Sequence, residues 1–167
     1  MRASDRPSRP KRVRTVPKTP VIATERAATP ARRRRSRAIV IHTIGHARAA
    51  LGAAAELGVG VTLLSPPGAA GYAGIGYFHK TIELAAADYP TVAFSAILDC
   101  AAEAGTVLAA FRRGVKCVRF HGAATVAAKL AAIGAQSGAT LASRTPRALD
   151  LRWVEDPAAA CRAWLAA

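Results

Sequence analysis

Three residues whose side chains exchange protons or orient other groups stand directly after short apolar runs of the sequence. They are His42, Asp99 and His121. Imidazole accepts and donates protons near neutral pH, and a carboxylate acts as a base or orients a neighbouring imidazole. If the ends of these runs meet in the fold, the three are candidate catalytic residues. A purely structural alternative is open for Asp99, because aspartate is a favoured N-cap of a following helix.

A glycine-rich stretch over residues 65–80 could hold an anion. Glycine lets the backbone approach a ligand closely and turn N–H groups towards it, and the positive end of a helix that begins at His79 would favour negative charge. The ligand-binding residues predicted here are Ser65, Gly68, Gly71, Gly74, Gly76, Tyr77, His79 and Lys80. Its aromatic side chains either line a pocket or pin the loop to the core. The stretch matches neither the dinucleotide fingerprint nor the P-loop, so it indicates no cofactor.

Two arginines after later apolar runs complete the predicted anion site. Arg119 and Arg144 could each bind a carboxylate or phosphate through two parallel hydrogen bonds, or lie as solvated charges at the rim.

Cys100 lacks the turn motif of an α/β-hydrolase nucleophile, and a reactive thiolate there would need a depressed pKa. His42 and His46 do not share a helical face, as a zinc-binding helix pair would, so no metal site is predicted.

Short apolar runs alternate with alanine-rich stretches from residue 38 onwards, which predicts strands alternating with helices. The predicted strands cover residues 39–41, 59–64, 91–98, 115–120 and 140–142, with a weaker sixth at 148–151. The predicted helices cover residues 46–57, 79–88, 103–113 and 123–136. The junctions before Val59, Val115 and Ala139 repeat one pattern of helix end, glycine and strand start, as successive right-handed βα units would.

These units predict an α/β fold with a mainly parallel sheet of five or six strands. The strands are almost entirely apolar, as expected when a sheet is covered on both faces, so we favour a doubly wound, Rossmann-like arrangement. An incomplete or half-sized βα barrel is the alternative, because the sequence does not reveal the strand order. In both architectures ligands bind at the carboxyl ends of the strands, where we expect the candidate residues to gather.

The positive charge is concentrated before this α/β region. Residues 1–37 hold 13 of the 24 Lys and Arg residues and two of the ten Asp and Glu residues, so they carry +11 of the total net charge of +14. Rich in proline and without apolar periodicity, they predict a basic, disordered arm, followed by a single α/β domain over residues 38–167. That domain holds 11 basic and eight acidic residues, a net charge of +3, which does not indicate a nucleic-acid surface of its own.

We expect the domain to bind a small anionic metabolite, bearing a phosphate or a carboxylate, at the carboxyl edge of its sheet, with or without catalysis. One alternative is a nucleic-acid-associated protein that uses the arm, because basic segments bind phosphates without sequence preference. Another is a non-catalytic oligomer or adaptor. A cytoplasmic protein without a membrane segment is expected, since prolines and glycines interrupt the uncharged stretch 57–78 and the three cysteines show no disulfide pattern.

Overall fold

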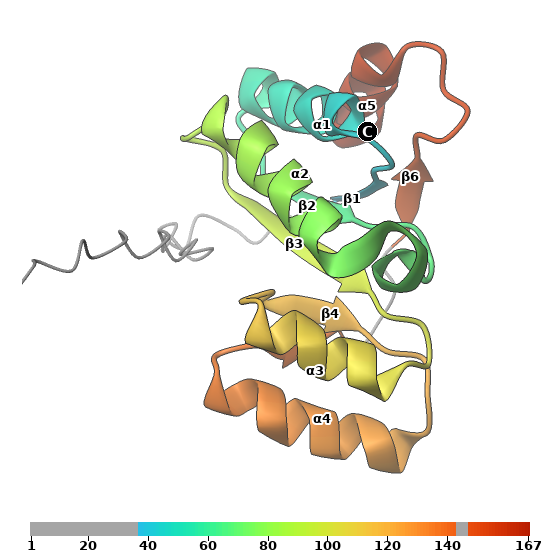
Figure 1. Cartoon of the computed structure of the whole chain (residues 1–167). Helices are drawn as coiled ribbons and strands as arrows, with labels where there is room; N and C mark the ends of the chain where they lie inside the picture. Colours follow the sequence, from blue (N-terminus) through green and yellow to red (C-terminus); the bar gives the residue numbers. More distant parts are fainter. Residues whose placement is uncertain (1–36, 143–146) are drawn as a thin grey trace, which may run out of the picture.

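The computed structural model of the chain describes residues 37–142 and 147–167 (Figure 1). Residues 1–36, nearly all of the predicted arm, and residues 143–146, which include Arg144, lie outside the described ranges. The strands are β1 (Arg37–Val40), β2 (Val61–Leu64), β3 (Phe94–Asp99), β4 (Cys117–Arg119), β5 (Thr140–Leu141) and β6 (Ala148–Asp150). The helices are α1 (Ile44–Leu57), α2 (Ile75–Ala87), α3 (Ala104–Arg112), α4 (Ala124–Gln136) and α5 (Pro157–Ala166), with a π-helical turn, η1 (Ala70–Gly74), before α2.

All six strands form one parallel sheet, in the order β5-β4-β3-β2-β1-β6. The predicted α/β fold, a parallel sheet built from successive βα units, is confirmed. Strands β1 to β5 follow one another across the sheet, as strands do in a βα barrel, whereas β6 returns to the other side of β1. Helix α5, which follows β6, packs against α1, which follows β1, so these two helices cover the same face of the sheet.

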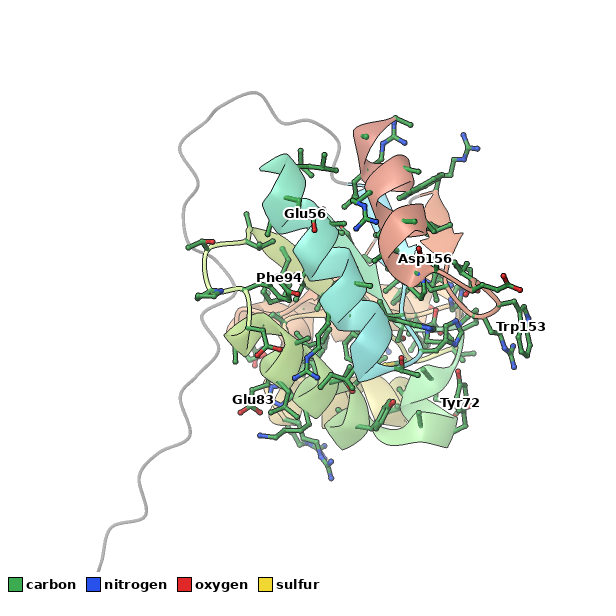
Figure 2. All side chains as sticks on the ribbon, turned by 90° about the horizontal axis from the view of Figure 1, so that it is seen from above. Glu56, Tyr72, Glu83, Phe94, Trp153 and Asp156 are labelled. Carbon is green, nitrogen blue, oxygen red and sulfur yellow. The ribbon has the colours of Figure 1, made fainter. Side chains whose placement is uncertain are left out.

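The helices pack on the sheet as neighbours of one another. α1 lies between α2 and α5, and α3 lies against α4 (Figure 1). The view from above shows α1 beside α5 again, with Trp153 projecting from the loop before α5 (Figure 2). The indole N–H of Trp164 in α5 donates to the Ala38 carbonyl at 3.0 Å, and the Arg37 guanidinium lies 5.4 Å from the indole centroid. α5 thus holds the start of β1, and Arg37, which the sequence pattern assigns to the arm, belongs to the first strand.

The two faces of the sheet differ because successive residues of a strand point to opposite sides. Leu98 and Val118, neighbours in the register of β3 and β4, are fully buried in the core. The next residues along these strands, Asp99 and Arg119, are also neighbours and point to the other face. The register from β6 through β1 and β2 to β3 places Asp150 on that same face. Polar side chains that end three strands therefore share one face and one edge.

Two predictions about the helices are wrong. α2 begins at Ile75, after η1, so His79 and Lys80 lie in its second turn and not at its positive end. Ile75 and Phe78 are buried, and this anchoring outweighs the weak helix propensity of the glycines around them. The sequence pattern also misses α5, which is short and rich in alanine. None of the helices in the described part of the chain is long and apolar enough to cross a membrane.

Candidate functional site

A buried carboxylate joins the carboxyl ends of β3 and β4. Asp99 is 2% exposed, and its Oδ2 accepts a hydrogen bond from Arg119 Nε at 2.6 Å and lies 2.9 Å from His121 Nε2. Its Oδ1 accepts from the backbone N–H groups of Gly68 at 2.8 Å and Ala101 at 2.9 Å. Hydrogen bonds to a charged group are the strong ones in proteins. Asp99 therefore fixes two basic side chains and the loop after β2 at one point of the edge.

The neighbours of Asp99 keep it ionised. Burial alone would raise the pKa of Asp99, but hydrogen bonds from Gly68, His121 and Ala101, together with the charge of Arg119, outweigh burial and lower that pKa. Both carboxylate oxygens are already engaged. We therefore assign Asp99 a positioning role, orienting Arg119 and His121, rather than direct action on a ligand.

The turn after β3 has an unusual backbone. Ala101 has a φ of 48°, in the left-handed region, which costs a residue with a Cβ about 1–2 kcal/mol. Its N–H donates to Asp99, and its carbonyl accepts from the His121 N–H at 2.8 Å. Strained residues of this kind concentrate at functional sites. Because α3 begins only after Glu103, Asp99 does not cap that helix, and the N-cap alternative is wrong.

Cys100 belongs to the core and not to the chemistry of the edge. Its side chain is 2% exposed, and burial followed by the charge of Asp99 raises the pKa of its thiol to about 12. A nucleophilic cysteine needs the opposite, a lowered pKa and access to solvent. The structure therefore argues against a thiolate nucleophile here.

The side chains of His121 and Arg119 are partly exposed to solvent, whereas Asp99 is buried. The His121 side chain is 46% exposed and that of Arg119 is 16% exposed. His121 Nε2 lies 2.9 Å from Asp99 Oδ2 and also 2.9 Å from Arg119 Nε. In the tautomer in which Nε2 donates to Asp99, Nδ1 is an acceptor, and in the other tautomer Nε2 accepts from Arg119 and Nδ1 is a donor. The guanidinium of Arg119 carries a positive charge. The edge thus presents a permanent cation beside a histidine whose orientation is fixed.

A second histidine–aspartate pair lies at the carboxyl ends of β1 and β6. His42 follows β1, and its Nε2 is 2.7 Å from Oδ1 of Asp150, the last residue of β6. Asp150 also accepts from the Arg152 N–H at 2.9 Å, and the His42 N–H donates to His46 Nδ1 at 3.3 Å. Burial, and then proximity to His42, lower the pKa of His46, which suits its role as an acceptor. This pair is more open than the first, with side-chain exposures of 20% for His42 and 55% for Asp150.

Both pairs have the same construction, in which Nε2 of a histidine meets a carboxylate from the neighbouring strand. No protein-family model matches the chain, and no curated protein matches it in sequence. The chemistry of the edge has to be inferred from its own groups: two oriented imidazoles, one guanidinium, and two carboxylates that hold them.

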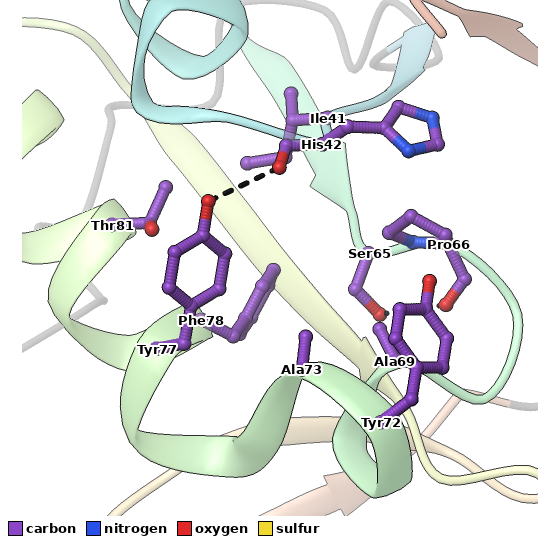
Figure 3. A pocket seen from close by; sticks show the side chains of 10 residues that line it. All are labelled: Ile41, His42, Ser65, Pro66, Ala69, Tyr72, Ala73, Tyr77, Phe78 and Thr81. Carbon is purple, nitrogen blue, oxygen red and sulfur yellow. Dashed lines mark hydrogen bonds between the residues drawn. The ribbon is translucent and has the colours of Figure 1, made fainter.

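A pocket of about 80 Å³ opens beside His42 (Figure 3). Tyr72 and Thr81 add their hydroxyls to its wall, and the hydroxyls of two other lining residues, Tyr77 and Ser65, are hydrogen-bonded within the protein. The Tyr77 hydroxyl donates to the His42 carbonyl at 3.2 Å, and the Ser65 hydroxyl accepts from the Asp99 N–H at 2.8 Å and donates to the Pro66 carbonyl at 3.2 Å. The pocket therefore offers mainly apolar contact. The lining residues are Ile41, His42, Ser65, Pro66, Ala69, Tyr72, Ala73, Tyr77, Phe78 and Thr81.

The structure brings together only some of the predicted site residues. One cluster contains Asp99, Arg119, His121, Ser65 and Gly68, and a second place, the pocket wall, contains His42 and Tyr77. Gly71 and Gly74 lie in η1 and Gly76 in the first turn of α2, so this segment is a helical wall rather than an open loop around an anion.

The remaining predicted residues are away from the cluster or undescribed. Lys80 is exposed and pairs with Glu83 at 3.1 Å, His79 lies one helical position before it, and Arg144 falls outside the described residues. Within residues 37–142 and 147–167, no three His, Cys, Asp or Glu side chains are placed to hold a metal ion. The ligand-binding and catalytic roles themselves remain predictions.

Sequence reasoning missed Asp150, the partner of His42. Asp150 lies inside the predicted sixth apolar run, 148–151, whereas Asp99 directly follows the third, 91–98; in the structure each is the last residue of its strand. The rule that selects residues after a predicted strand passed over it, because the sixth run was predicted to extend to residue 151 while β6 ends at Asp150. The pocket could not be found in this way, since much of its wall is made of small apolar side chains that carry no chemical signature.

Proposed function

We propose that the carboxyl edge of the sheet binds a small anion, a metabolite bearing a phosphate or a carboxylate, between the two histidine–aspartate pairs. The observation that carries this proposal is the buried Asp99 carboxylate, which holds Arg119 and His121 on the face and edge that also carry the His42–Asp150 pair. Buried ion pairs add little net stability, because desolvation offsets the attraction between the charges. Binding of an anionic ligand to the Arg119 guanidinium and the His121 imidazole would explain why these side chains are held by a buried carboxylate.

The same groups supply acid–base chemistry. Each imidazole is anchored through Nε2, which leaves Nδ1 of His121 and of His42 as the ring atom that could exchange a proton with a ligand. Catalysis is thus an extension of the binding proposal, with His42 and His121 as the proton-transfer groups and Asp99 and Asp150 as their positioning partners.

Nuclear magnetic resonance titration of the full chain with inorganic phosphate and with acetate, at constant ionic strength, tests the proposal. The Arg119→Gln and His121→Gln variants should bind at least tenfold more weakly, because each lost hydrogen bond to a charged group contributes about 1.5–3 kcal/mol. Arg162→Gln is the matched control, since Arg162 is 45% exposed on α5 and its nearest carboxylate is 3.7 Å away. Equal affinities for all four proteins would refute binding at this edge.

A second candidate function, nucleic-acid association, is supported by one observation, the net charge of +11 on residues 1–37. Replacing Arg32, Arg33, Arg34 and Arg35 by glutamine in the full chain should weaken binding to duplex DNA and flatten its salt dependence, because fewer counterions are released. The Arg119→Gln variant should bind DNA as the parent does. Unchanged DNA affinity after the fourfold replacement would argue against this function.

A further inference from the structure

We infer that the anionic ligand carries a short, unbranched apolar group of about three carbon atoms, which enters the pocket beside His42. This inference rests on the proposed anion site and specifies the class of ligand that the site would take: a small carboxylate or phosphate ester with a short alkyl tail.

The pocket and the anion site share structural parts. His42 lines the pocket and also forms the pair with Asp150. The segment after β2 likewise connects the pocket to the Asp99 cluster, since Pro66 lines the pocket and the N–H of Gly68, two residues later, donates to Asp99. A tail in the pocket would therefore leave its head group at the edge, next to the oriented basic side chains.

The interior of the pocket favours an alkyl group over a polar one. The hydroxyls of Tyr77 and Ser65 and the ring of His42 already have hydrogen-bond partners within the protein. A polar group placed beside these three side chains would gain little, whereas an alkyl group gains the free energy of leaving water. The volume of about 80 Å³ holds about three methyl or methylene groups if each takes about the room of a water molecule, 30 Å³.

The shape of the pocket depends on the junction between η1 and α2. Gly74 has a φ of 90°, a conformation open to glycine, and there the chain leaves η1 and begins α2. Figure 3 shows Ala73 at the base of the pocket, between Tyr72 on one side and Tyr77 with Phe78 on the other. Because Ala73 carries only a methyl group, a longer side chain at this position would occupy the space assigned to the tail.

A chain-length series tests the inference. The full chain is titrated with the straight-chain carboxylates from acetate to hexanoate and, in parallel, with inorganic phosphate and the methyl to butyl phosphates. In whichever series binds, affinity should rise about fourfold for each methylene that becomes buried. The rise should end after about three carbons, when the tail fills the pocket. Affinity that does not change with chain length would overturn the inference but leave the proposed function standing.

Filling the pocket provides the second arm. Ala73→Leu should abolish the gain with chain length while leaving the affinity for acetate or inorganic phosphate within about twofold, whereas Ala132→Leu, on an exposed position of α4, should behave as the parent does. A gain that persists in Ala73→Leu would show that the tail binds elsewhere. If no member of either series binds the parent protein, both the inference and the proposed function are wrong.

Discussion

Replacement of Asp99 by asparagine should destabilise the fold much more than the same replacement at Asp150. Asparagine keeps the carbonyl oxygen that accepts from the Gly68 and Ala101 N–H groups. It replaces Oδ2 with an amide that cannot accept from Arg119 or His121, so two charge-assisted interactions are lost.

The magnitude follows from the burial of each partner. Breaking a buried ion pair by removing one member costs about 3–5 kcal/mol. Arg119 is 16% exposed and His121 is 46% exposed, so water recovers part of that loss, and we expect about 2–3 kcal/mol for Asp99→Asn. Asp150 is 55% exposed, and surface pairs contribute about 0.2–1 kcal/mol, so Asp150→Asn should cost less than about 1 kcal/mol.

Urea unfolding of the full chain, followed by circular dichroism, measures both costs. Because the pKa of Asp99 is lowered in the folded protein, its stabilisation is fully present above the ordinary aspartate pKa of about 4 and is lost as the pH falls through the lower folded value. The difference between the parent and Asp99→Asn should therefore be largest at pH 7 and shrink below about pH 4. Equal costs at the two positions, or a difference that grows in acid, would refute the account of Asp99 as the buried anchor.

Three further outcomes follow from single positions. Gly74→Ala should lower the free energy of unfolding in urea by about 1–3 kcal/mol, because the φ of 90° at Gly74 strains any residue with a Cβ. Gly71→Ala, with open space around the added Cβ, should be neutral or slightly stabilising. Similar effects of the two substitutions would contradict this reasoning. Gly134→Ala would bring a Cβ within 2.9 Å of Phe111 Cζ and should lower the melting temperature, so an unchanged value would show looser packing of α4. Iodoacetamide at pH 8 should modify Cys100 only after unfolding, and rapid labelling of the native protein, detected by mass spectrometry, would disprove its burial.

The elements of the fold could be predicted because their signals are local. Each observed strand overlaps a predicted apolar run, including the weak one at 148–151, and four of the five helices lie where the pattern of apolar residues predicts them. The start of α2 was misplaced because its glycines indicate a loop, while the burial of Ile75 and Phe78 is decided by the rest of the fold. The strand order could not be predicted, because it depends on contacts between segments that are distant in the sequence.

The site was predicted residue by residue but not as an assembly. The rule that parallel strands end at one edge selected Asp99, Arg119 and His121 individually. Their hydrogen bonds require the register of β3 with β4, which the sequence does not specify. Asp150 was missed because β6 has only three residues and an indistinct apolar pattern, although the residue type and its position at a strand end were suitable.

The two histidine–aspartate pairs depend on the fold in different ways. Asp99 and His121 are 22 residues apart and come from consecutive strands, so one βα unit brings them together. His42 and Asp150 are 108 residues apart and meet only because β6 returns past four strands to lie beside β1. Helix α5 contacts both strands, since Trp164 donates to the Ala38 carbonyl in β1 and its ring lies 5.5 Å from the guanidinium of Arg147, directly before β6. A ligand that needs both pairs can therefore bind only to the completed sheet, whereas one that needs only the Asp99 cluster would still bind if β6 were displaced.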